Sequence, residues 1–295
     1  MKKIIVFFKA LFSTIAKIPS LISKQFKEFV VYYNTPKVTA KSIEWYGWKS
    51  DQPDQRDFKY SSISRELQAL PSSADLRYNC PPVVSQSTLG SCTGNALAGV
   101  LGYLEEKDSN KTQPFNPLSR LFIYYNERAI EGTVNSDSGA AIRDGIKTLK
   151  SQGACSEAIW PYKISSFKKK PSTKAYLDGK NHVIQTYARL STLSDMKNCL
   201  ASGFPFVFGF TVYESFESDE VAKTGIVPMP AATEKILGGH AVVCVGFDDS
   251  TQRFLVRNSW GIDWGQNGYF TMPYEYLTNP NLASDFWMIT KAKNL

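Results

Sequence analysis

Hydrophobic positions follow two different spacings along the chain, and the change falls near residue 180. Before it, apolar side chains recur every three or four positions, as on one face of a helix. After it, short apolar runs rich in β-branched and aromatic residues predict strands, with one short helix at about 194–201. The runs are His182–Tyr187, Phe206–Phe210, His240–Val245, Phe254–Val256, Tyr269–Met272 and Phe286–Ile289. Helices followed by strands predict an α+β protein.

The first predicted helix has Cys92 in its opening turn. It follows a glycine–serine pair, and its apolar stripe is formed by Leu97, Val100, Leu101 and Leu104. Unpaired backbone N–H groups and the positive end of the dipole at a helix start favour a thiolate. Cys92 is therefore a candidate nucleophile, although an isolated cysteine is more often a small buried apolar residue.

Two further helices are expected before the strands begin. One should start at Asn116–Pro117, because asparagine is a favoured cap and proline a favoured first helical residue. The other should span 139–150 and stop before Gly153.

Two polar residues stand at the ends of predicted strands in the second half. His240 opens one apolar run, and Asn258 follows another. The only other histidine, His182, is assigned a structural or surface role. A nucleophilic cysteine, a histidine base and an amide that orients the histidine form the cysteine version of a catalytic triad. Cys92, His240 and Asn258 are therefore the candidate catalytic residues.

With these residues the sequence resembles the papain family of cysteine peptidases, over about residues 70–290. The resemblance rests on Gly90-Ser-Cys92, on Asn258-Ser-Trp-Gly, on the glycine-rich stretch up to Phe270 and on Gln86, six residues before the cysteine. It implies a two-lobed fold, with a helical lobe (71–180), an antiparallel β-barrel-like lobe (181–295) and an active cleft between them.

The resemblance also assigns roles. It implies that Cys92 is the nucleophile, His240 the general base and Asn258 the amide that orients it. By the same match Gln86 donates to the oxyanion, and Trp260 shields the Asn–His hydrogen bond from water.

Some positions depart from the family pattern. Leu89 stands where the family usually has a cysteine, and the partner stretch is replaced by Ser136–Ala141, so the usual disulfide cannot form. Gly139 in this stretch is still expected to serve as a backbone wall for substrate. Gly239 precedes the histidine, where aspartate or asparagine is common.

Ser284 and Asp285 are candidates to border the pocket for the second residue upstream of the cleaved bond. An acid there would favour basic substrate side chains. Loop capping or a salt bridge explains these two residues equally well.

Composition is that of an ordinary soluble globule, with 43% apolar and 21% charged residues. The net charge of +7 is concentrated at the N-terminus, because six lysines less Glu28 give +5 for residues 1–33 and leave +2 elsewhere. This distribution argues against a nucleic-acid partner and points to a membrane surface or a partner protein.

Five cysteines are present: Cys80, Cys92, Cys155, Cys199 and Cys244. Cys199 and Cys244 lie in apolar segments and are predicted to be buried thiols, while a Cys80–Cys155 bridge stays open. A disulfide-poor protein suits a reducing compartment such as the cytoplasm or a virion. The spacing of cysteines and histidines fits no metal site, so no cofactor is expected.

Residues 1–33 are predicted to form a basic amphipathic helix, interrupted near Pro19. Lys9 and Lys17 break the apolar core that a secretory signal needs, and the run of about twenty apolar residues of a spanning helix is absent. A helix that docks on a membrane surface or a partner protein is the preferred interpretation. A degenerate signal peptide and a mobile tail are the alternatives.

Residues 34–70 are interpreted as a pro-segment or linker, broken by proline and glycine. Its aromatic residues should anchor it in a surface groove: Trp45, Tyr46, Trp48, Phe58 and Tyr60. The segment resembles the opening of a microbial or viral-type branch of the family and lacks the long helical pro-domain of cathepsins.

The sequence therefore predicts a monomeric cysteine endopeptidase that cleaves protein or peptide substrates through a thioester and is made as a zymogen. An exopeptidase is disfavoured because His182 is the only histidine left to hold a substrate terminus. Two alternatives are a catalytically retired papain-like binding protein and an acyl transferase that uses the same triad.

Overall fold

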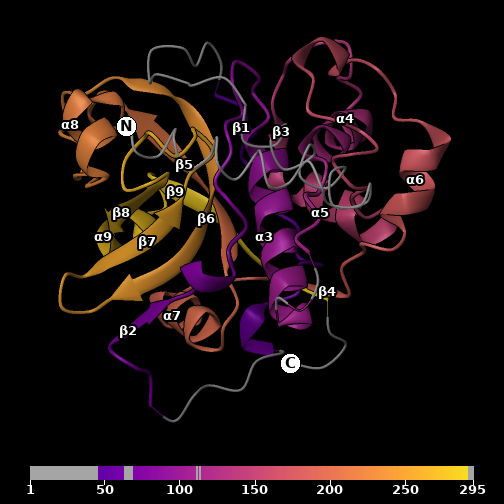
Figure 1. Ribbon diagram of the computed structural model, residues 1–295. Coiled ribbons are helices and arrows are strands. Elements are labelled where there is room, and N and C mark those ends of the chain that lie inside the picture. Colours follow the sequence, from indigo (N-terminus) through magenta and orange to yellow (C-terminus); the bar gives the residue numbers. More distant parts are fainter. Residues whose placement is uncertain (1–45, 63–68, 111, 113, 292–295) are drawn as a thin grey trace, which may run out of the picture. The chain divides into compact units, whose positions relative to one another are not determined.

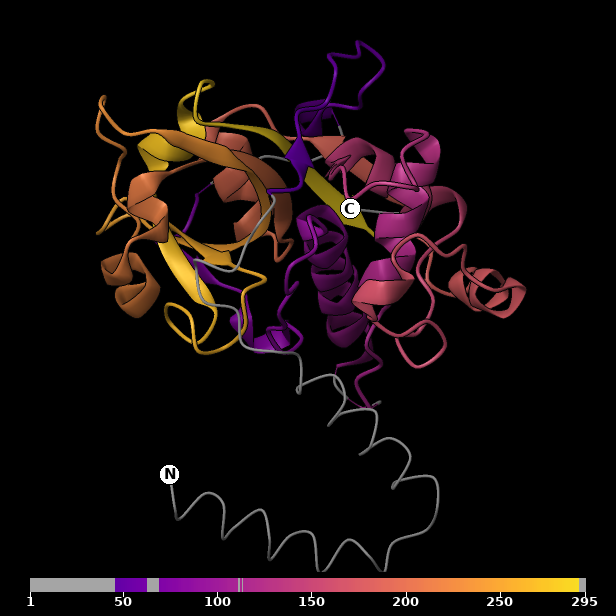
Figure 2. The same cartoon turned by 90° about the horizontal axis from the view of Figure 1, so that it is seen from above.

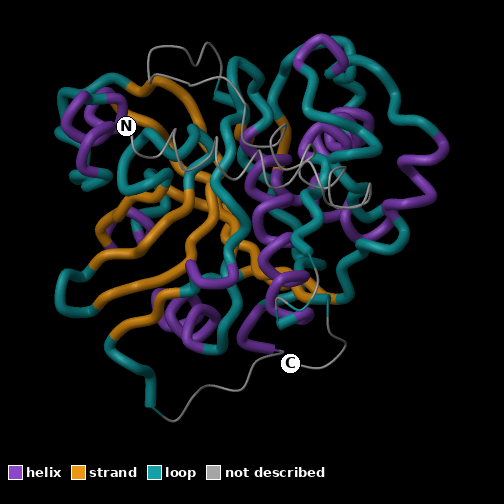
Figure 3. Tube along the Cα trace, viewed as in Figure 1, coloured by secondary structure: helices purple, strands orange, loops and turns teal. Residues whose placement is uncertain are grey.

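Helices and strands separate into two lobes, with helix α3 (Cys92–Ser109) at their boundary (Figures 1 and 3). The computed structural model describes residues 46–62, 69–110, 112 and 114–291, all within one unit, Lys37–Leu295. The predictions for residues 1–33 and for Trp45 lie outside the described residues. No helix in the described ranges has the length and apolarity needed to cross a membrane.

The helical lobe contains α3, α4 (Arg120–Ile130), α5 (Ile142–Ser151) and α6 (Thr173–Gly179). Helix α3 begins at Cys92, as predicted, and its apolar stripe is buried. The predicted start of α4 at Asn116–Pro117 is wrong, because Ser119 caps this helix by accepting from the Phe122 N–H.

Helix α5 also begins later than expected, at Ile142. Gly139 lies before the helix with φ +68°, a left-handed conformation that cannot open a helix. The predicted stop is confirmed, because α5 ends at Ser151 and Gly153 follows with φ +73°.

The second lobe is built on a seven-stranded antiparallel sheet in the order β4-β9-β5-β6-β7-β8, with β2 paired to β6. The α+β fold is confirmed, but no closed barrel forms in the part of the chain that the structure describes. The strands are β2 (Ser73–Asp75), β4 (Thr186–Arg189), β5 (Phe206–Tyr213), β6 (Ile236–Asp248), β7 (Arg253–Arg257), β8 (Tyr269–Pro273) and β9 (Ala283–Thr290).

Three short helices lie in the connections between the strands of this sheet. Helix α7 (Leu193–Ala201) was predicted, whereas α8 (Asp219–Thr224) and α9 (Tyr274–Thr278) were not. A separate two-stranded sheet pairs β1 (Trp48–Lys49) in parallel with β3 (Ala140–Ala141). The 3-10 turns are Tyr60–Ser62, Arg77–Asn79, Ile164–Ser166 and Glu214–Glu217.

Two strand predictions need correction. His240 does not open its strand, because β6 starts at Ile236 and the residues before the histidine already pair with the end of β5. His182 precedes β4, and its Nδ1 lies 2.7 Å from Glu105 Oε1, which supports a structural role. All five cysteines are free thiols, so the Cys80–Cys155 bridge is not formed.

Strand β6 joins the two lobes because its side chains alternate between two cores. Ala241, Val243 and Val245 pack with the stripe of α3, whereas Val242 and Cys244 belong to the aromatic core of the sheet lobe. Figure 2 shows α3 lying between the sheet and the other helices. This packing brings the start of α3 to the middle of β6.

Gly145 on α5 provides a test of the helical packing. A Cβ there would lie 2.1 Å from Leu97 Cδ1 and 2.3 Å from Glu127 Oε1. We expect Gly145→Ala to lower the free energy of unfolding by about 1–3 kcal/mol through overpacking, although alanine favours helices. Denaturant titration measures this, and Lys147→Ala on the exposed face of α5 should change stability by less than about 0.5 kcal/mol. A stabilised Gly145→Ala protein would contradict the packing.

Candidate active site

Cys92 is fully buried at the first position of α3. Burial raises the pKa of its thiol to about 12 and outweighs the backbone N–H groups of Ala241, Gly47 and Thr93, which donate toward the sulfur and lower the pKa. The expected effect of the helix start is therefore overridden, and the thiol is neutral in this structure. The bond from Ala241, the residue after His240, brings β6 directly onto the sulfur.

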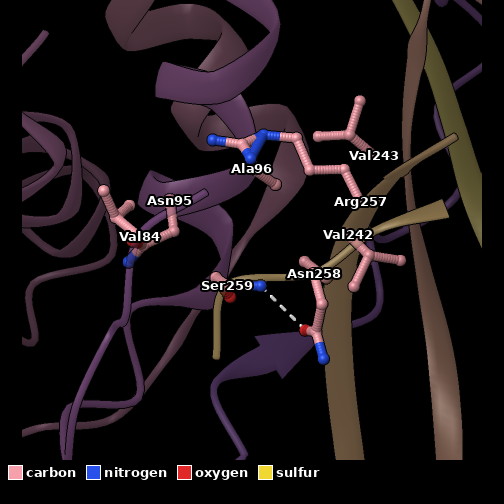
Figure 4. A pocket seen from close by; sticks show the side chains of 9 residues that line it. Val84, Asn95, Ala96, Val242, Val243, Arg257, Asn258 and Ser259 are labelled. Atoms are coloured by element: carbon pink, nitrogen blue, oxygen red, sulfur yellow. Dashed lines mark hydrogen bonds between the residues drawn. The ribbon is translucent and has the colours of Figure 1, made fainter. Parts of the chain in front are cut away.

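His240 is oriented by Asn258, which directly follows β7. His240 Nε2 lies 2.8 Å from Asn258 Oδ1. The same oxygen accepts from the Ser259 N–H at 2.8 Å, and Figure 4 shows this second bond. Because an amide oxygen only accepts, the ring carries its proton on Nε2. Nδ1 is thereby left as the basic nitrogen.

Aromatic rings enclose the imidazole. The Trp260 ring, 1% exposed, lies 5.2 Å from that of His240 between centroids, and Phe210, Phe216 and Tyr46 lie at 5.7, 6.4 and 6.2 Å. This burial lowers the pKa of His240 to about 4, and the bond to Asn258 only partly offsets it. Histidine and cysteine are therefore both neutral in this state.

Gln86 is tied to the same site through Ser259. Its Nε2 donates to the Leu89 carbonyl at 2.9 Å, and its Oε1 accepts from Ser259 Oγ at 2.7 Å. Sequence reasoning did not identify Ser259, which contacts both Gln86 and Asn258. Together these bonds fix the loop before α3 against the loop after β7.

The chain's own residues 46–51 lie between the two lobes at this site. β1 pairs with β3, and the Ala140 N–H donates to the Gly47 carbonyl at 2.7 Å. Gly47 is so close to Gly90 that an added Cβ would lie 1.6 Å from the Gly90 oxygen. The predicted groove for this segment is therefore the junction that holds Cys92 and His240.

The aromatic anchors of the segment differ in their contacts. Tyr46 packs on the His240 ring and donates a hydrogen bond to Glu217, and Tyr60 is buried. The prediction fails for Phe58, which is 61% exposed and touches only the edge of Tyr187 among the rings described.

Three candidate substrate-binding residues contact this segment. A Cβ on Gly139 would lie 2.1 Å from the Gly47 oxygen, and one on Gly239 would lie 2.6 Å from Trp48 Cε3. Asp285 Oδ2 accepts from Trp48 Nε1 at 3.2 Å. Of the other candidates, Ser284 pairs with Gly209 in the sheet and Trp260 covers the histidine.

A charged cluster, which the sequence did not predict, fastens the segment. Arg189 lies 3.1–3.2 Å from Asp51, Asp57 and Asp285, and Arg143 pairs with Asp57. Burial, together with the neighbouring Asp285, raises the pKa of Asp51 to about 6. Three carboxylates therefore share two guanidinium groups.

The space behind Asn258 admits no substrate. A cavity of about 10 Å³ lies there, lined in part by Asn95, Ala96, Val243 and Arg257 (Figure 4). It has about the volume of one water molecule. Residues 46–51, in contrast, lie directly on Cys92, because the Gly47 N–H donates toward the sulfur.

Comparison with known proteins agrees with this geometry. The model of the "Papain family cysteine protease" family matches residues 70–286. The chain belongs to the papain family of cysteine proteases. It is a cysteine-type peptidase with a papain-like fold, and its substrates are proteins or peptides.

Members of the papain family from very different sources resemble this chain. The "Uncharacterized peptidase C1-like protein L477" of Acanthamoeba polyphaga mimivirus is 43% identical over 269 residues, which are 83% of this chain and 86% of the relative. Xylellain, a cysteine protease from Xylella fastidiosa, is 43% identical with a TM-score of 0.77, covering 88% of this chain and 100% of that structure. "Cysteine proteinase 3" of Entamoeba histolytica is 25% identical, covering 72% of this chain and 66% of the relative.

Lowering the pH acts on the release of residues 46–51 from the site through two groups, His240 and Asp51, whose protonation has opposite effects. His240, with its pKa lowered from 6.5 to about 4, is neutral under the segment, so protonation between these values favours release. Asp51, with its pKa raised from 3.8 to about 6, takes up a proton in the closed state and favours closure. We expect little net pH dependence of release between about 4 and 6, and steadily greater release with acidity in Asp51→Asn.

Amide hydrogen exchange of residues 46–51, corrected for the intrinsic rate, measures this release. Cys92→Ala in both proteins removes self-cleavage and the thiol as a partner of the histidine. Identical pH dependence in the two proteins would contradict the opposing titrations.

Proposed function

We propose that this peptidase is an endopeptidase that acts through a thioester on Cys92. His240 Nδ1 takes the thiol proton, and the sulfur attacks the substrate carbonyl carbon. The protonated histidine then gives its proton to the leaving amine as the C–N bond breaks. Water, deprotonated by His240, hydrolyses the thioester and restores the thiol.

Gln86 and the backbone N–H of Cys92 stabilise the oxyanion in this proposal. One amide hydrogen of Gln86 bonds the Leu89 carbonyl, which leaves the second for the substrate oxygen. A donor of this kind is commonly worth about 3 kcal/mol in the transition state.

One observation carries the assignment. The 2.8 Å bond from His240 to Asn258 leaves Nδ1 as the base, and the next residue, Ala241, donates toward Cys92 Sγ. A retired member of the fold would not need this tautomer, held under an aromatic cover.

The enzyme is made in a latent form, with residues 46–62 as the blocking part of the pro-segment. Gly47 lies against Gly90 and Gly139, and Tyr46 covers His240. The covered thiol and imidazole are neutral because water is excluded. Displacing the segment would rehydrate both groups and allow the thiolate–imidazolium pair to form.

Replacing the nucleophile tests the assignment. Cys92→Ala should abolish peptide hydrolysis and labelling by an epoxysuccinyl inhibitor, while the unfolding transition stays cooperative. Peptide mapping of the labelled parent protein should place the adduct on Cys92. Hydrolysis that persists in Cys92→Ala, or an adduct on another cysteine, would sink the mechanism.

A single methyl group tests the latency. Gly47→Ala places a Cβ against the Gly90 carbonyl, so the segment must leave the site. We expect the rate of Cys92 labelling to rise about tenfold or more, because a clash with backbone costs about 1–3 kcal/mol. Ser50→Ala, at an exposed neighbouring position, should label like the parent. Equal labelling of Gly47→Ala and Ser50→Ala would show that the segment does not block the thiol.

A further inference from the structure

Trp48 fills a side-chain pocket beside the catalytic histidine. A Cβ added to Gly209 would lie 2.0 Å from the Trp48 indole, and one added to Gly239 would lie 2.6 Å from it. These two glycines therefore form two walls of the pocket. Gly239 directly precedes His240 in β6. A side chain at either wall would exclude the ring, and the pocket therefore has the size of a large aromatic group.

Asp285 forms the floor of this pocket. The β5–β9 register shifts between Val207 and Gly209, which marks a bulge, and Asp285 has φ +58° there. Its Oδ2 accepts from Trp48 Nε1 at 3.2 Å and from the Asp51 N–H at 2.8 Å. Both donors belong to the segment, so its departure leaves a buried acceptor aimed into the pocket.

The charge around the floor changes sign when the segment leaves. Asp51 and Asp57 depart with the blocking part of the pro-segment, residues 46–62, whereas Arg143, Arg189 and Asp285 stay. With the segment in place, three carboxylates face two guanidinium groups. After it leaves, one carboxylate faces the same two guanidinium groups. A lysine or arginine would then meet a net positive site whose single carboxylate already pairs with Arg189.

We propose that, in the active enzyme, the pocket filled by Trp48 selects a large aromatic substrate side chain, tryptophan above all, and rejects lysine and arginine. The proposal rests on the endopeptidase function proposed above. A neutral indole supplies the N–H that Asp285 Oδ2 has lost and covers the two glycine walls. Of the two alternatives that the sequence left open for Asp285, the salt bridge is formed, and Arg189 neutralises the acid that would have favoured basic side chains.

Cleavage of a synthetic peptide mixture, with products sequenced by mass spectrometry, tests the pocket. The full chain with Gly47→Ala opens the site. At one fixed position from the cleaved bond we expect tryptophan to exceed phenylalanine by about tenfold, the effect of one hydrogen bond to a carboxylate. Lysine and arginine should be depleted at the same position.

Two further substitutions separate the shape of the pocket from its chemistry. Gly209→Ala puts a methyl group where the indole lies, so the preference for tryptophan and phenylalanine should disappear while peptides with small side chains are still cleaved. Asp285→Asn tolerates the left-handed backbone and should lower only the ratio of tryptophan to phenylalanine. Asp249→Asn removes a carboxylate that pairs with Lys197 and should leave the cleavage preferences unchanged.

The outcomes distinguish this inference from the proposed function. Enrichment of lysine or arginine, or an aromatic preference that survives Gly209→Ala, overturns the pocket inference. Cleavage with no positional preference overturns it as well and leaves the endopeptidase intact. Absence of both cleavage and epoxysuccinyl labelling in the Gly47→Ala protein overturns the proposed function itself.

Discussion

Exclusion of water from Cys92 and His240 is the physical constraint on which the state of this molecule depends. A thiol and an imidazole in contact exchange a proton readily only if the resulting ion pair is stabilised. Here burial moves their pKa values apart, to about 12 for the cysteine and about 4 for the histidine, so both stay neutral. Trp260, Phe210 and Phe216 form part of the cover over the histidine, and Tyr46 and Gly47 complete the cover over the two groups. One short segment therefore contributes to the protonation state of the site.

Close approach of backbones makes this covering effective. The backbone of Gly47 contacts the backbones of Gly90 and Gly139, because none of the three residues has a side chain. The next residues of the segment form β1, which pairs with β3. Farther along the segment, Trp48 and Asp51 reach Asp285. The glycines therefore leave room for the backbone of the segment, and the ion pairs of its aspartates fix its position along the site.

The sequence predicted α3 and β7, which carry or precede the candidate catalytic residues, because the signals of these elements are local. The Gly-Ser-Cys stretch and a 3.6-residue apolar stripe specify the start of α3, and a short apolar run before Asn258 specifies β7. Helix starts were less accurate, since Ser119 competes with Asn116 as a cap and Gly139 adopts a left-handed conformation.

The sequence did not predict that residues 46–51 cover the site, because this arrangement depends on contacts between residues far apart in the chain. Trp48 and Asp285 are 237 positions apart, and their contact needs a bulge that periodicity does not reveal. Aromatic residues in 34–70 predicted a docked segment, but nothing local indicated that it would dock on the candidate catalytic residues. The sequence left Asp285 open between a substrate-pocket acid and a salt bridge for the same reason, because its partner Arg189 lies on another strand.

Once the segment is displaced, Cys92 and His240 are expected to act as one unit. The direct measurement is the rate of Cys92 alkylation by iodoacetamide against pH, in Gly47→Ala with and without His240→Ala. With the histidine present, the thiol should stay reactive well below pH 7, because a paired thiolate has a pKa of about 3–4. Without it, reactivity should rise only near the ordinary thiol pKa of about 8.5. Coincident profiles would contradict the account.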